Sequence, residues 1–482
     1  MADIGNKVLI GAFWMTLSVW GNRLIGMAST IILARLLLPD DYGLVAMASL
    51  VVNFLAIMSS TGMETYLIRI KDINKQHYNT AWTLNLLICF FLGVFLYLNA
   101  GFFSRYFEDA RLEKIWFILS LVIISSGLKN IGLAQLKKEF NYNKVFLHGL
   151  LVKISGFITT IYLAYMLRNY WAMIYGTVVT SIFDVLLSYY FSSYRPWFSL
   201  KGFKEQWDFS KWIFLKNISG FVRQKTDQLV VTKILGSESM GYYSMASDIS
   251  NLPAELIYPA MGPTYSAYSM LLDKPEELNA AFITFIGIIA VLAFPMFGGL
   301  VFVANDIVII LLGEKWIRAV EIIQFFSLLV ILQLFSFAAN GFLTALGKVK
   351  LITILDWSYA ILLIPILIYA AFYKELIYVV AARAISYLFL SLFFFMMVGS
   401  VAKIPYSRMI VVVIRPLLMT LIMILVLSSL NNLLVDIERM LSLAINILVG
   451  CFVYALGSYL LWLISGRKEG GERFILANLK LI

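Results

Sequence analysis

The chain has 482 residues, of which 61% are hydrophobic and 14% are charged, and its formal net charge is +10. Soluble proteins of this length carry roughly 25% charged and about 45–50% apolar residues. The composition therefore excludes a soluble globular protein and predicts an all-α polytopic integral membrane protein. The positive net charge needs no nucleic acid partner, because most Lys and Arg residues lie in predicted loops on one side of the membrane, where they set the topology.

Charged and turn residues divide the chain into fourteen apolar segments, each long enough to cross a bilayer as a helix. The longest connection, about 194–208, is too short to bury a core of its own. The loops on the side of the N-terminus hold more than twice as many Lys and Arg residues as the opposite loops, which predicts that both termini are cytoplasmic. The predicted spans are 8–37, 41–66, 80–104, 113–136, 144–167, 170–193, 209–236, 240–268, 278–303, 318–346, 349–373, 375–399, 408–430 and 441–465.

Cysteine and histidine are too rare and too scattered to form a metal or disulfide site. Cys89 and Cys451 lie in different predicted spans, and His77 and His148 lie near the cytoplasmic side. We therefore predict no metal site and no catalytic residues.

Residues around the first predicted hairpin recur 198 positions later without a gap. An even number of spans in each copy leaves both copies in the same orientation, so the pattern predicts two parallel-repeat six-helix lobes. The N-lobe would be 1–200 with spans 1–6 and the C-lobe 201–402 with spans 7–12, followed by spans 13 and 14 and a cytoplasmic tail at 403–482. The matched pairs are Trp14 and Trp212, Arg35 and Lys233, Asp40 and Glu238, Gly43 and Gly241, Met47 and Met245, and Ala48 and Ala246.

The seventh predicted span carries several charges although it is otherwise apolar. Lys216, Arg223 and Asp227 share one helical face, because their spacing follows the helical period. A charge at bilayer depth costs about 2.5–3.5 kcal/mol on the more lenient insertion scale. This face therefore needs either a water-filled cavity or charge partners. Lys225 points to another side of the same helix, where it faces either the cavity or a partner inside the lobe.

Other polar residues within spans are candidates for the same cavity. Arg23 lies near the middle of the first span, and Asn53 lies on the polar stripe of the second. We expect Arg23 and Arg223 to contact an anionic substrate, whereas an intrahelical pair of Arg223 with Asp227 is the structural alternative. Lys153 either contacts substrate or forms a buried pair with Asp184, and Asp356 and Arg383 invite the same two interpretations in the C-lobe. Glu64 and Lys129 are expected at the inner membrane interface.

Carboxylates within the spans are candidates for energy coupling. Asp248 and Glu255 continue the charged face of the seventh span into the eighth, and Asp356 lies in the eleventh. These groups could bind a coupling cation or relay a proton, and Asp248 and Glu255 could equally balance Arg223. We expect no cofactor, with transport driven by protons, sodium or the membrane potential.

Three segments carry a resemblance to a known family. The segment 33–48, Leu-Ala-Arg-Leu-Leu-Leu-Pro-Asp-Asp-Tyr-Gly-Leu-Val-Ala-Met-Ala, resembles the first hairpin of the Wzx-type polysaccharide flippases. The segments Leu-Lys-Lys-Glu-Phe-Asn-Tyr at 136–142 and Tyr-Arg-Pro-Trp-Phe at 194–198 resemble loops of the same family. Within it, the chain is similar to the colanic-acid exporter group, and the wider superfamily includes multidrug extruders and the lipid II flippase.

The resemblance implies a function as well as a fold. It implies a V-shaped pair of lobes in the bacterial inner membrane. These lobes would move an undecaprenyl-diphosphate-linked oligosaccharide from the cytoplasmic to the periplasmic leaflet by alternating access, for exopolysaccharide or O-antigen assembly. Polysaccharide polymerase machinery is an implied partner. The matching motifs lie in hairpins and loops, so they identify the family rather than the sugar.

Elementary chemistry agrees with that cargo. A diphosphate needs cationic donors, and the planar guanidinium of arginine bonds two phosphate oxygens at once. A lipid II flippase would need the same groups, and so remains an alternative. A cation-coupled drug extruder should have a net acidic cavity, whereas the first and seventh spans are net basic. A polytopic sugar polymerase or glycosyltransferase should carry a large external loop or cytoplasmic domain, which this pattern does not predict.

Overall fold

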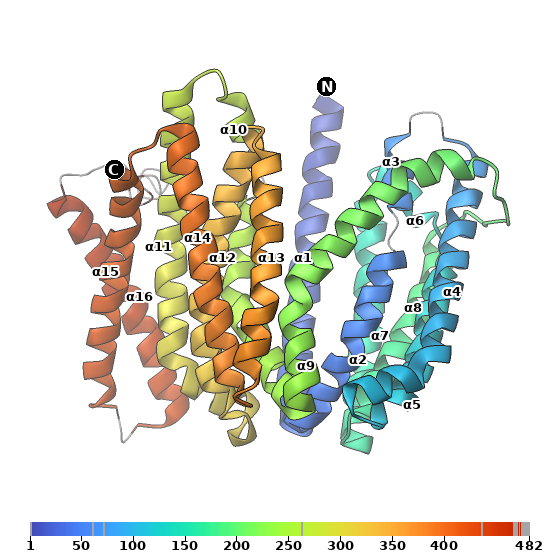
Figure 1. Cartoon of the computed structure of the whole chain (residues 1–482), viewed down its shortest axis with the longest axis horizontal. Helices are drawn as coiled ribbons and strands as arrows, with labels where there is room; N and C mark the ends of the chain where they lie inside the picture. The colour runs from blue at the N-terminus through green and yellow to red at the C-terminus, as the bar shows by residue number, and fades with distance from the viewer. Residues whose placement is uncertain are drawn as a thin grey trace. The chain divides into compact units, whose positions relative to one another are not determined.

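The computed structural model describes residues 2–59, 62–70, 73–261, 264–434 and 437–465, together with Gly471 and Arg473. It confirms an all-α membrane protein, since eleven of the described helices are long and apolar enough to cross a bilayer. The chain divides into two compact units, Met1–Gly241 and Tyr242–Ile482, coloured blue to green and green to red in Figure 1. The predicted lobe boundaries at 200 and 402 remain a prediction.

Unit 1 begins with the helices α1 (Ala2–Leu36) and α2 (Pro39–Ser59). Pro39 is the first residue of α2, where its missing N–H costs nothing. Gly43 lies one turn inside α2, and the chain reverses at 37–38.

Two predicted spans of unit 1 are shorter than expected. The second ends before Gly62, whose φ of 74° lies in the left-handed region and separates α2 from α3 (Met63–Arg69). The fourth, predicted to reach 136, ends as α5 (Arg111–Gly127), and the short α6 (Leu133–Lys138) follows. Asn130 stabilises this break, since its side chain accepts from Gly132 N at 2.8 Å and donates to Tyr194 O at 2.7 Å.

The remaining helices of unit 1 are α4 (Lys75–Phe107), α7 (Tyr142–Leu167), α8 (Trp171–Phe191) and the first part of α9 (Phe203–Met261). Gly156 and Gly176 lie against the Thr180 and Thr160 side chains of the opposite helix, so α7 and α8 approach closely. The predicted spans 209–236 and 240–268 join inside α9 without a loop. Gly236, with φ 80° and ψ −174°, is the one non-helical position within α9 and marks their junction.

Unit 2 follows the predicted spans closely. Its long helices from residue 275 onward begin and end within four residues of the predicted limits, because long apolar runs bounded by charges define such helices well. The elements are α10 (Thr264–Met270), α11 (Pro275–Ile307), a π-helical turn at Val308–Leu312, a 3₁₀ turn at Glu314–Trp316, α12 (Ala319–Ala345), α13 (Val349–Ala371), α14 (Leu376–Ala402), α15 (Tyr406–Asn431) and α16 (Arg439–Ile464).

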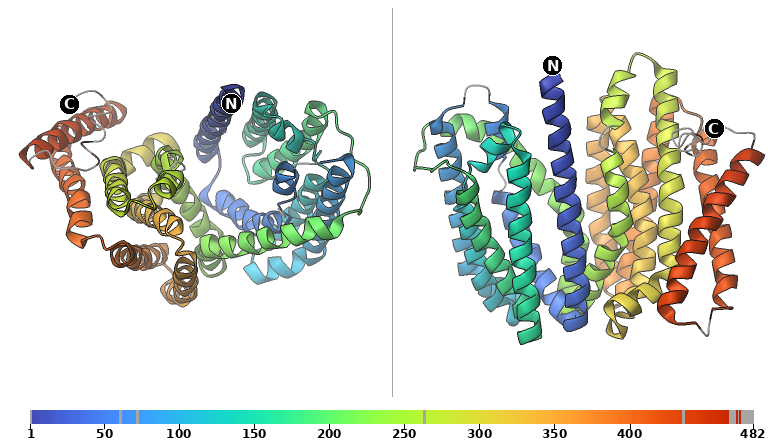
Figure 2. Two further views of the ribbon diagram at one scale, coloured as in Figure 1. Left: turned by 90° about the horizontal axis from the view of Figure 1, so that it is seen from above. Right: turned by 180° about the vertical axis from the view of Figure 1, so that it is seen from behind.

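The core of unit 2 forms around α12, the most buried of the candidate membrane spans. The rings of Phe282 on α11 and Phe342 on α12 lie 4.3 Å apart between centroids. On its other side α11 packs against α15 and α16, as both views in Figure 2 show. Tyr454 of α16 joins this packing by donating its hydroxyl to Val291 O at 3.0 Å. The last two helices, α15 and α16, are thus joined to the other helices of unit 2 through α11.

Candidate functional site

Two of the predicted cavity cations lie together where α1 packs against α7 in unit 1. Lys153 of α7 points at α1, and a Cβ added to Gly26 would lie 3.9 Å from its Nζ. Arg23 lies three residues before Gly26, one helical turn away, and is half-buried. Among the residues that the structure describes, Lys153 has no hydrogen bond or ion pair. Lys153 is thus a half-buried cation on the side of α7 that packs against α1.

The helices α2 and α9 meet near the other predicted cavity residues. Phe54 of α2 and Phe221 of α9 have ring centroids 5.2 Å apart. Asn53, next to Phe54, is exposed, and on α9 Lys225 is half-buried while Asp227 is buried. Arg223 lies on α9, but its side chain is outside the described part of the structure, as is that of Lys216.

Asp184 shows that one interpretation of Lys153 is wrong. Asp184 of α8 accepts from Lys129 Nζ at 2.9 Å, and its other oxygen lies 3.3 Å from His148 Nε2. Asp184 therefore pairs with Lys129 and not with Lys153, and the pair is partly exposed. Since α5 ends at Gly127 rather than 136, Lys129 lies in the connection beside α8 and can reach Asp184. Lys153 instead lies beside Gly26 of α1.

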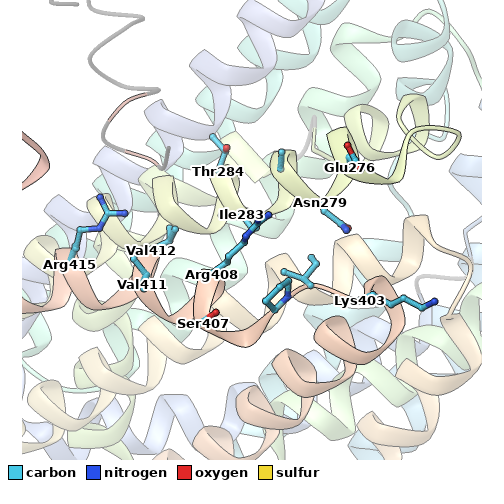
Figure 3. A pocket seen from close by; sticks show the side chains of 13 residues that line it. Glu276, Asn279, Ile283, Thr284, Lys403, Ser407, Arg408, Val411, Val412 and Arg415 are labelled. Carbon is cyan, nitrogen blue, oxygen red and sulfur yellow. The ribbon is translucent and has the colours of Figure 1, made fainter. Parts of the chain in front are cut away.

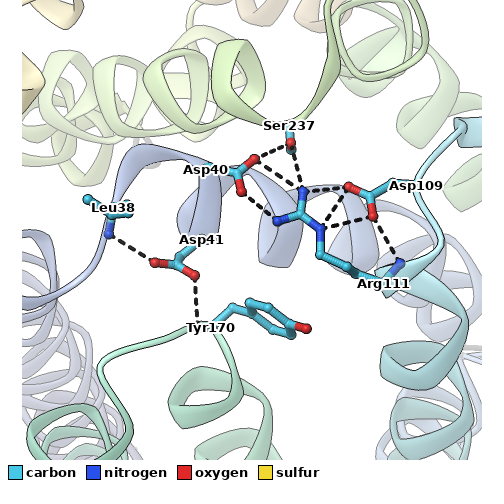
Figure 4. A network of polar contacts seen from close by, with 7 residues as sticks. All are labelled: Leu38, Asp40, Asp41, Asp109, Arg111, Tyr170 and Ser237. Carbon is cyan, nitrogen blue, oxygen red and sulfur yellow. Dashed lines mark hydrogen bonds and ion pairs between the residues drawn. The ribbon is translucent and has the colours of Figure 1, made fainter.

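An ion-pair network that the sequence did not predict links the first hairpin to the α4–α5 turn (Figure 4). Arg111 Nη1 donates to Asp40 Oδ2 at 2.6 Å, and Nη2 donates to Asp109 Oδ2 at 2.6 Å. Its Nε also donates to Asp109 Oδ1 at 3.0 Å. Ser237 of α9 completes the network by hydrogen bonds with Arg111, at 3.3 Å, and with Asp40. The guanidinium is held by two carboxylates, which suits a structural role.

Asp41, the neighbour of Asp40, is buried and ties two chain segments together. Its Oδ2 accepts from Leu38 N at 3.0 Å, which closes the turn before α2, and its Oδ1 accepts from Tyr170 N at 3.1 Å at the start of α8. The Pro-Asp-Asp part of the hairpin motif therefore forms bonds within unit 1, and the motif belongs to the scaffold.

The loop motif at 194–198 is also part of the scaffold. Trp197 N donates to Asn79 Oδ1 at 2.9 Å, and the rings of Trp82 and Phe198 lie 5.3 Å apart. Both contacts attach the loop to α4. Burial of the Tyr194 hydroxyl raises its pKa to about 12, so this tyrosine stays neutral at physiological pH.

The predicted repeat has a direct counterpart in one contact of unit 1. A Cβ on Gly43 would collide with the carbonyl oxygen of Ser237, and a Cβ on Gly241 would collide with the carbonyl oxygen of Pro39. Pro39 and Ser237 are themselves separated by the 198 residues that separate the two glycines. Such an exchange of partners is typical of local two-fold symmetry, and it explains why both positions are glycine.

Lys233, the repeat partner of Arg35, also contacts the α4–α5 turn. Its Nζ donates to Glu108 Oε1 and to Tyr106 O, both at 2.6 Å, and lies 5.0 Å from the Tyr106 ring centroid. This hydrogen bond holds the pKa of the Glu108 carboxyl below its usual value. Lys233 is therefore anchored by the α4–α5 turn.

The charged groups predicted for energy coupling lie in unit 2. Asp248 on α9 is exposed, while Glu255 on α9 and Asp356 on α13 are half-buried. Arg383 of α14 donates to the hydroxyl of Tyr243 at 2.5 Å, and Tyr243 is completely buried. Tyr243 was not predicted as a partner, because it lies 140 residues from Arg383 and no sequence pattern connects the two. Pairing of Asp356 with Arg383 stays a prediction.

No group of three or more His, Cys, Asp or Glu side chains within the described ranges is arranged to hold a metal ion. The chemistry that the described side chains offer is electrostatic and hydrogen bonding.

The comparisons with known proteins identify the family. Residues 32–321 match the model of a family described as polysaccharide biosynthesis protein. The chain belongs to this family. It is 24% identical over 356 residues to the lipopolysaccharide biosynthesis protein WzxC of Escherichia coli K12, covering 72% of each chain. It is 23% identical over 318 residues to the succinoglycan biosynthesis transport protein ExoT of Rhizobium meliloti, covering 65% of this chain and 64% of that one. The predicted membership of the Wzx-type family is thus confirmed.

The fold has a solved counterpart. The structure of the lipid II flippase MurJ in its inward closed conformation superposes with a TM-score of 0.75, covering 93% of this chain and 98% of MurJ at 16% identity. At that identity the likeness establishes the fold. This family member therefore shares the fold of that flippase, and the all-α membrane fold expected from the sequence is confirmed.

Proposed function

We propose that this protein is a flippase that moves an undecaprenyl-diphosphate-linked oligosaccharide from the cytoplasmic to the periplasmic leaflet of the bacterial inner membrane. It would work by alternating access, with fourteen spans arranged as two six-helix lobes and two further helices, and it would supply units to polysaccharide polymerase machinery. The observation that carries the proposal is the position of Lys153 against Gly26 of α1, one helical turn from Arg23, where α1 packs against α7.

That pair fits a diphosphate. Lys153 lies eleven residues after the start of α7, which places it about 16 Å along the helix, near the middle of a bilayer core of about 30 Å. A cation at this depth is expensive unless an anion or water solvates it. A diphosphate passing this point would be held by an ammonium and a guanidinium from two helices, while the prenyl chain stays in lipid. Arg223 from α9 would add a third cation, with Lys225, Asp227 and Asn53 contacting sugar hydroxyls.

The first experiment identifies the cargo. We expect a strain lacking the gene to accumulate a prenyl-linked oligosaccharide on the cytoplasmic leaflet, which can be extracted and analysed by mass spectrometry. Accumulation of lipid II would favour the lipid II flippase alternative. Increased drug sensitivity without any accumulating lipid would contradict the proposal and favour a multidrug extruder.

The second experiment tests the cations. Arg23→Ala, Arg223→Ala and Lys153→Gln should each lower export by about tenfold or more, since a hydrogen bond to a charged group contributes about 1.5–3 kcal/mol. The control is Lys144→Gln, which removes an exposed charge from the same helix as Lys153. All variants should insert at normal levels. Wild-type export by Arg23→Ala and Lys153→Gln would remove these residues from the mechanism.

We further propose that Asp248, Glu255 or Asp356 binds the coupling proton or sodium ion. Replacing the coupling residue by its amide should abolish transport driven by an imposed ion gradient while leaving cargo binding intact. If all three amide variants respond to the gradient like the wild type, the membrane potential alone remains as the driving force.

A further inference from the structure

A pocket of about 640 Å³ lies in unit 2 between α11 and α15. Figure 3 shows its two walls, with Glu276, Asn279 and Thr284 on α11 facing the segment that carries Lys403, Arg408 and Arg415. Arg408 and Arg415 are seven residues apart and therefore share one face of α15. Apolar residues lie between the polar ones on both walls, namely Ala280, Ile283, Val411 and Val412.

The cations of this pocket reach from its mouth to its interior. Lys403 and Arg408 are exposed, whereas Arg415 is only 8% exposed. At 1.5 Å per residue, Arg415 lies about 10 Å further along α15 than Arg408. The pocket therefore has cationic groups at two depths, joined by an apolar wall. Among the described residues that line it, Glu276 is the one carboxylate.

Arg415 differs from Arg111 and Arg383 in the hydrogen-bond partners that the described chain gives its guanidinium group. Arg111 is held by Asp40 and Asp109, and Arg383 donates to Tyr243. By contrast, Nη1 of Arg415 is buried without a hydrogen-bond partner in the described part of the chain, where Arg408 and Lys403 also form no ion pair. Because burying a charge is costly unless it is compensated, a guanidinium in this position favours an anion.

We propose that this pocket binds the phosphate group of a membrane lipid, with Arg415 and Arg408 as donors. Arginine suits phosphate because its donors bond two oxygens at once. The apolar wall would contact the first carbons of the lipid chain. Ile410, Ile414 and Leu418 make the adjoining face of α15 apolar and exposed, as expected for a lipid-facing surface, so a lipid can enter from the side. The Lys/Arg bias predicts that the mouth lies at the cytoplasmic surface, where anionic lipids are attracted to basic residues.

The site goes beyond the proposed translocation, which needs only the α1–α7 cations and α9. The phosphate could come from an anionic phospholipid or from a prenyl phosphate, and the experiment separates these sources. Purified full-length protein in detergent is titrated with dioleoylphosphatidylglycerol, with decaprenyl phosphate or with dioleoylphosphatidylcholine, and bound lipid is counted by native mass spectrometry. Since the readout is binding, failure of this proposal is distinct from failure of the proposed transport.

The variants are Arg415→Gln and Arg408→Gln, and the control is Lys350→Gln, an exposed cation at the predicted cytoplasmic end of α13. We expect phosphatidylglycerol to bind about tenfold more weakly to both arginine variants and unchanged to the control. A loss seen with decaprenyl phosphate alone assigns the pocket to the prenyl carrier and supports the phosphate chemistry. If Arg415→Gln does not fold, Arg408→Gln, at the exposed mouth, still decides the question.

Three results would overturn the proposal. Wild-type affinity of both arginine variants for all three lipids would show that the pocket holds no lipid phosphate. An equal loss in Lys350→Gln would show that binding depends on surface charge in general. Displacement of phosphatidylglycerol by millimolar inorganic phosphate would show that the pocket takes the soluble anion instead of a lipid.

Discussion

Arg111 in unit 1 is about 40% exposed and Arg415 in unit 2 is buried, and the two guanidinium groups differ in what surrounds them. Arg111 has carboxylates on two sides and a serine on a third, all supplied by the chain. Arg415 faces a pocket, and its Nη1 has no partner among the described residues. A guanidinium that the protein neutralises itself stabilises the fold, whereas one that faces a pocket is available to a ligand. Lys153 likewise has no ion pair among the described residues.

The largest effect should come from the glycine contact beside the Arg111 network. Gly43→Ala would place a Cβ inside the carbonyl oxygen of Ser237, and neither backbone can move without disturbing α2 or α9. We expect a loss of about 3 kcal/mol or more of stability, or no folded protein. Thermal melting in detergent measures the loss. The control is Gly21→Ala in α1, where no atom lies within 4 Å of the added carbon. Equal melting temperatures of the two variants would contradict the tight contact.

Arg111→Lys should have a smaller effect, which tests the structural half of the comparison. Lysine keeps the charge but cannot bond Asp40 and Asp109 at once. Because Arg111 and Asp40 are each about 40% exposed, we expect a loss of about 1 kcal/mol. Melting temperatures should fall for Arg111→Lys and stay unchanged for Lys153→Gln. A fall of the same size in Lys153→Gln would show that both cations are structural.

The smallest effect should be a pH dependence at the α4–α5 turn. Lys233 lowers the pKa of Glu108 below its usual 4.5. The folded carboxyl thus binds its proton less readily than the unfolded one. Its contribution is present above about pH 4.5 and is lost as the pH falls through the lowered pKa. Glu108→Gln should remove this part of the acid sensitivity of the melting temperature. If the melting temperature of Glu108→Gln falls with acid as steeply as that of the wild type, the ion pair adds nothing to stability.

The sequence predicted the limits of helices correctly where those limits depend on one helix alone. The helices of unit 2 were placed within a few residues because their length and apolarity are local properties, and the 198-residue repeat was visible in the identities at Gly43 and Gly241. It was less successful where position depends on tertiary contacts. The end of α5 at Gly127 depends on Asn130 bonding to Tyr194, 64 residues away.

The polar contacts were harder to predict than the helices. Asp184 pairs with Lys129 instead of Lys153, because equal depth along two helices does not say which side each residue faces. Arg111 was not singled out, since its partner Asp40 is 71 residues away and no periodicity connects them. The pocket beside Arg415 could not be predicted, because it depends on α11, more than a hundred residues earlier.

The crossing at Gly43 and Gly241 has a mechanical consequence. At this point α2 and α9 touch backbone to backbone, with no side chain of either glycine between them. In ordinary helix packing, side chains of one helix fill grooves of the other, so rotation requires side chains to leave those grooves. Here the glycines leave no side chain of their own to hold the two helices in register, and the hydrogen bond of Ser237 with Asp40 joins α9 to α2 instead. The angle between α2 and α9 is therefore set at this point by hydrogen bonds and not by side-chain packing.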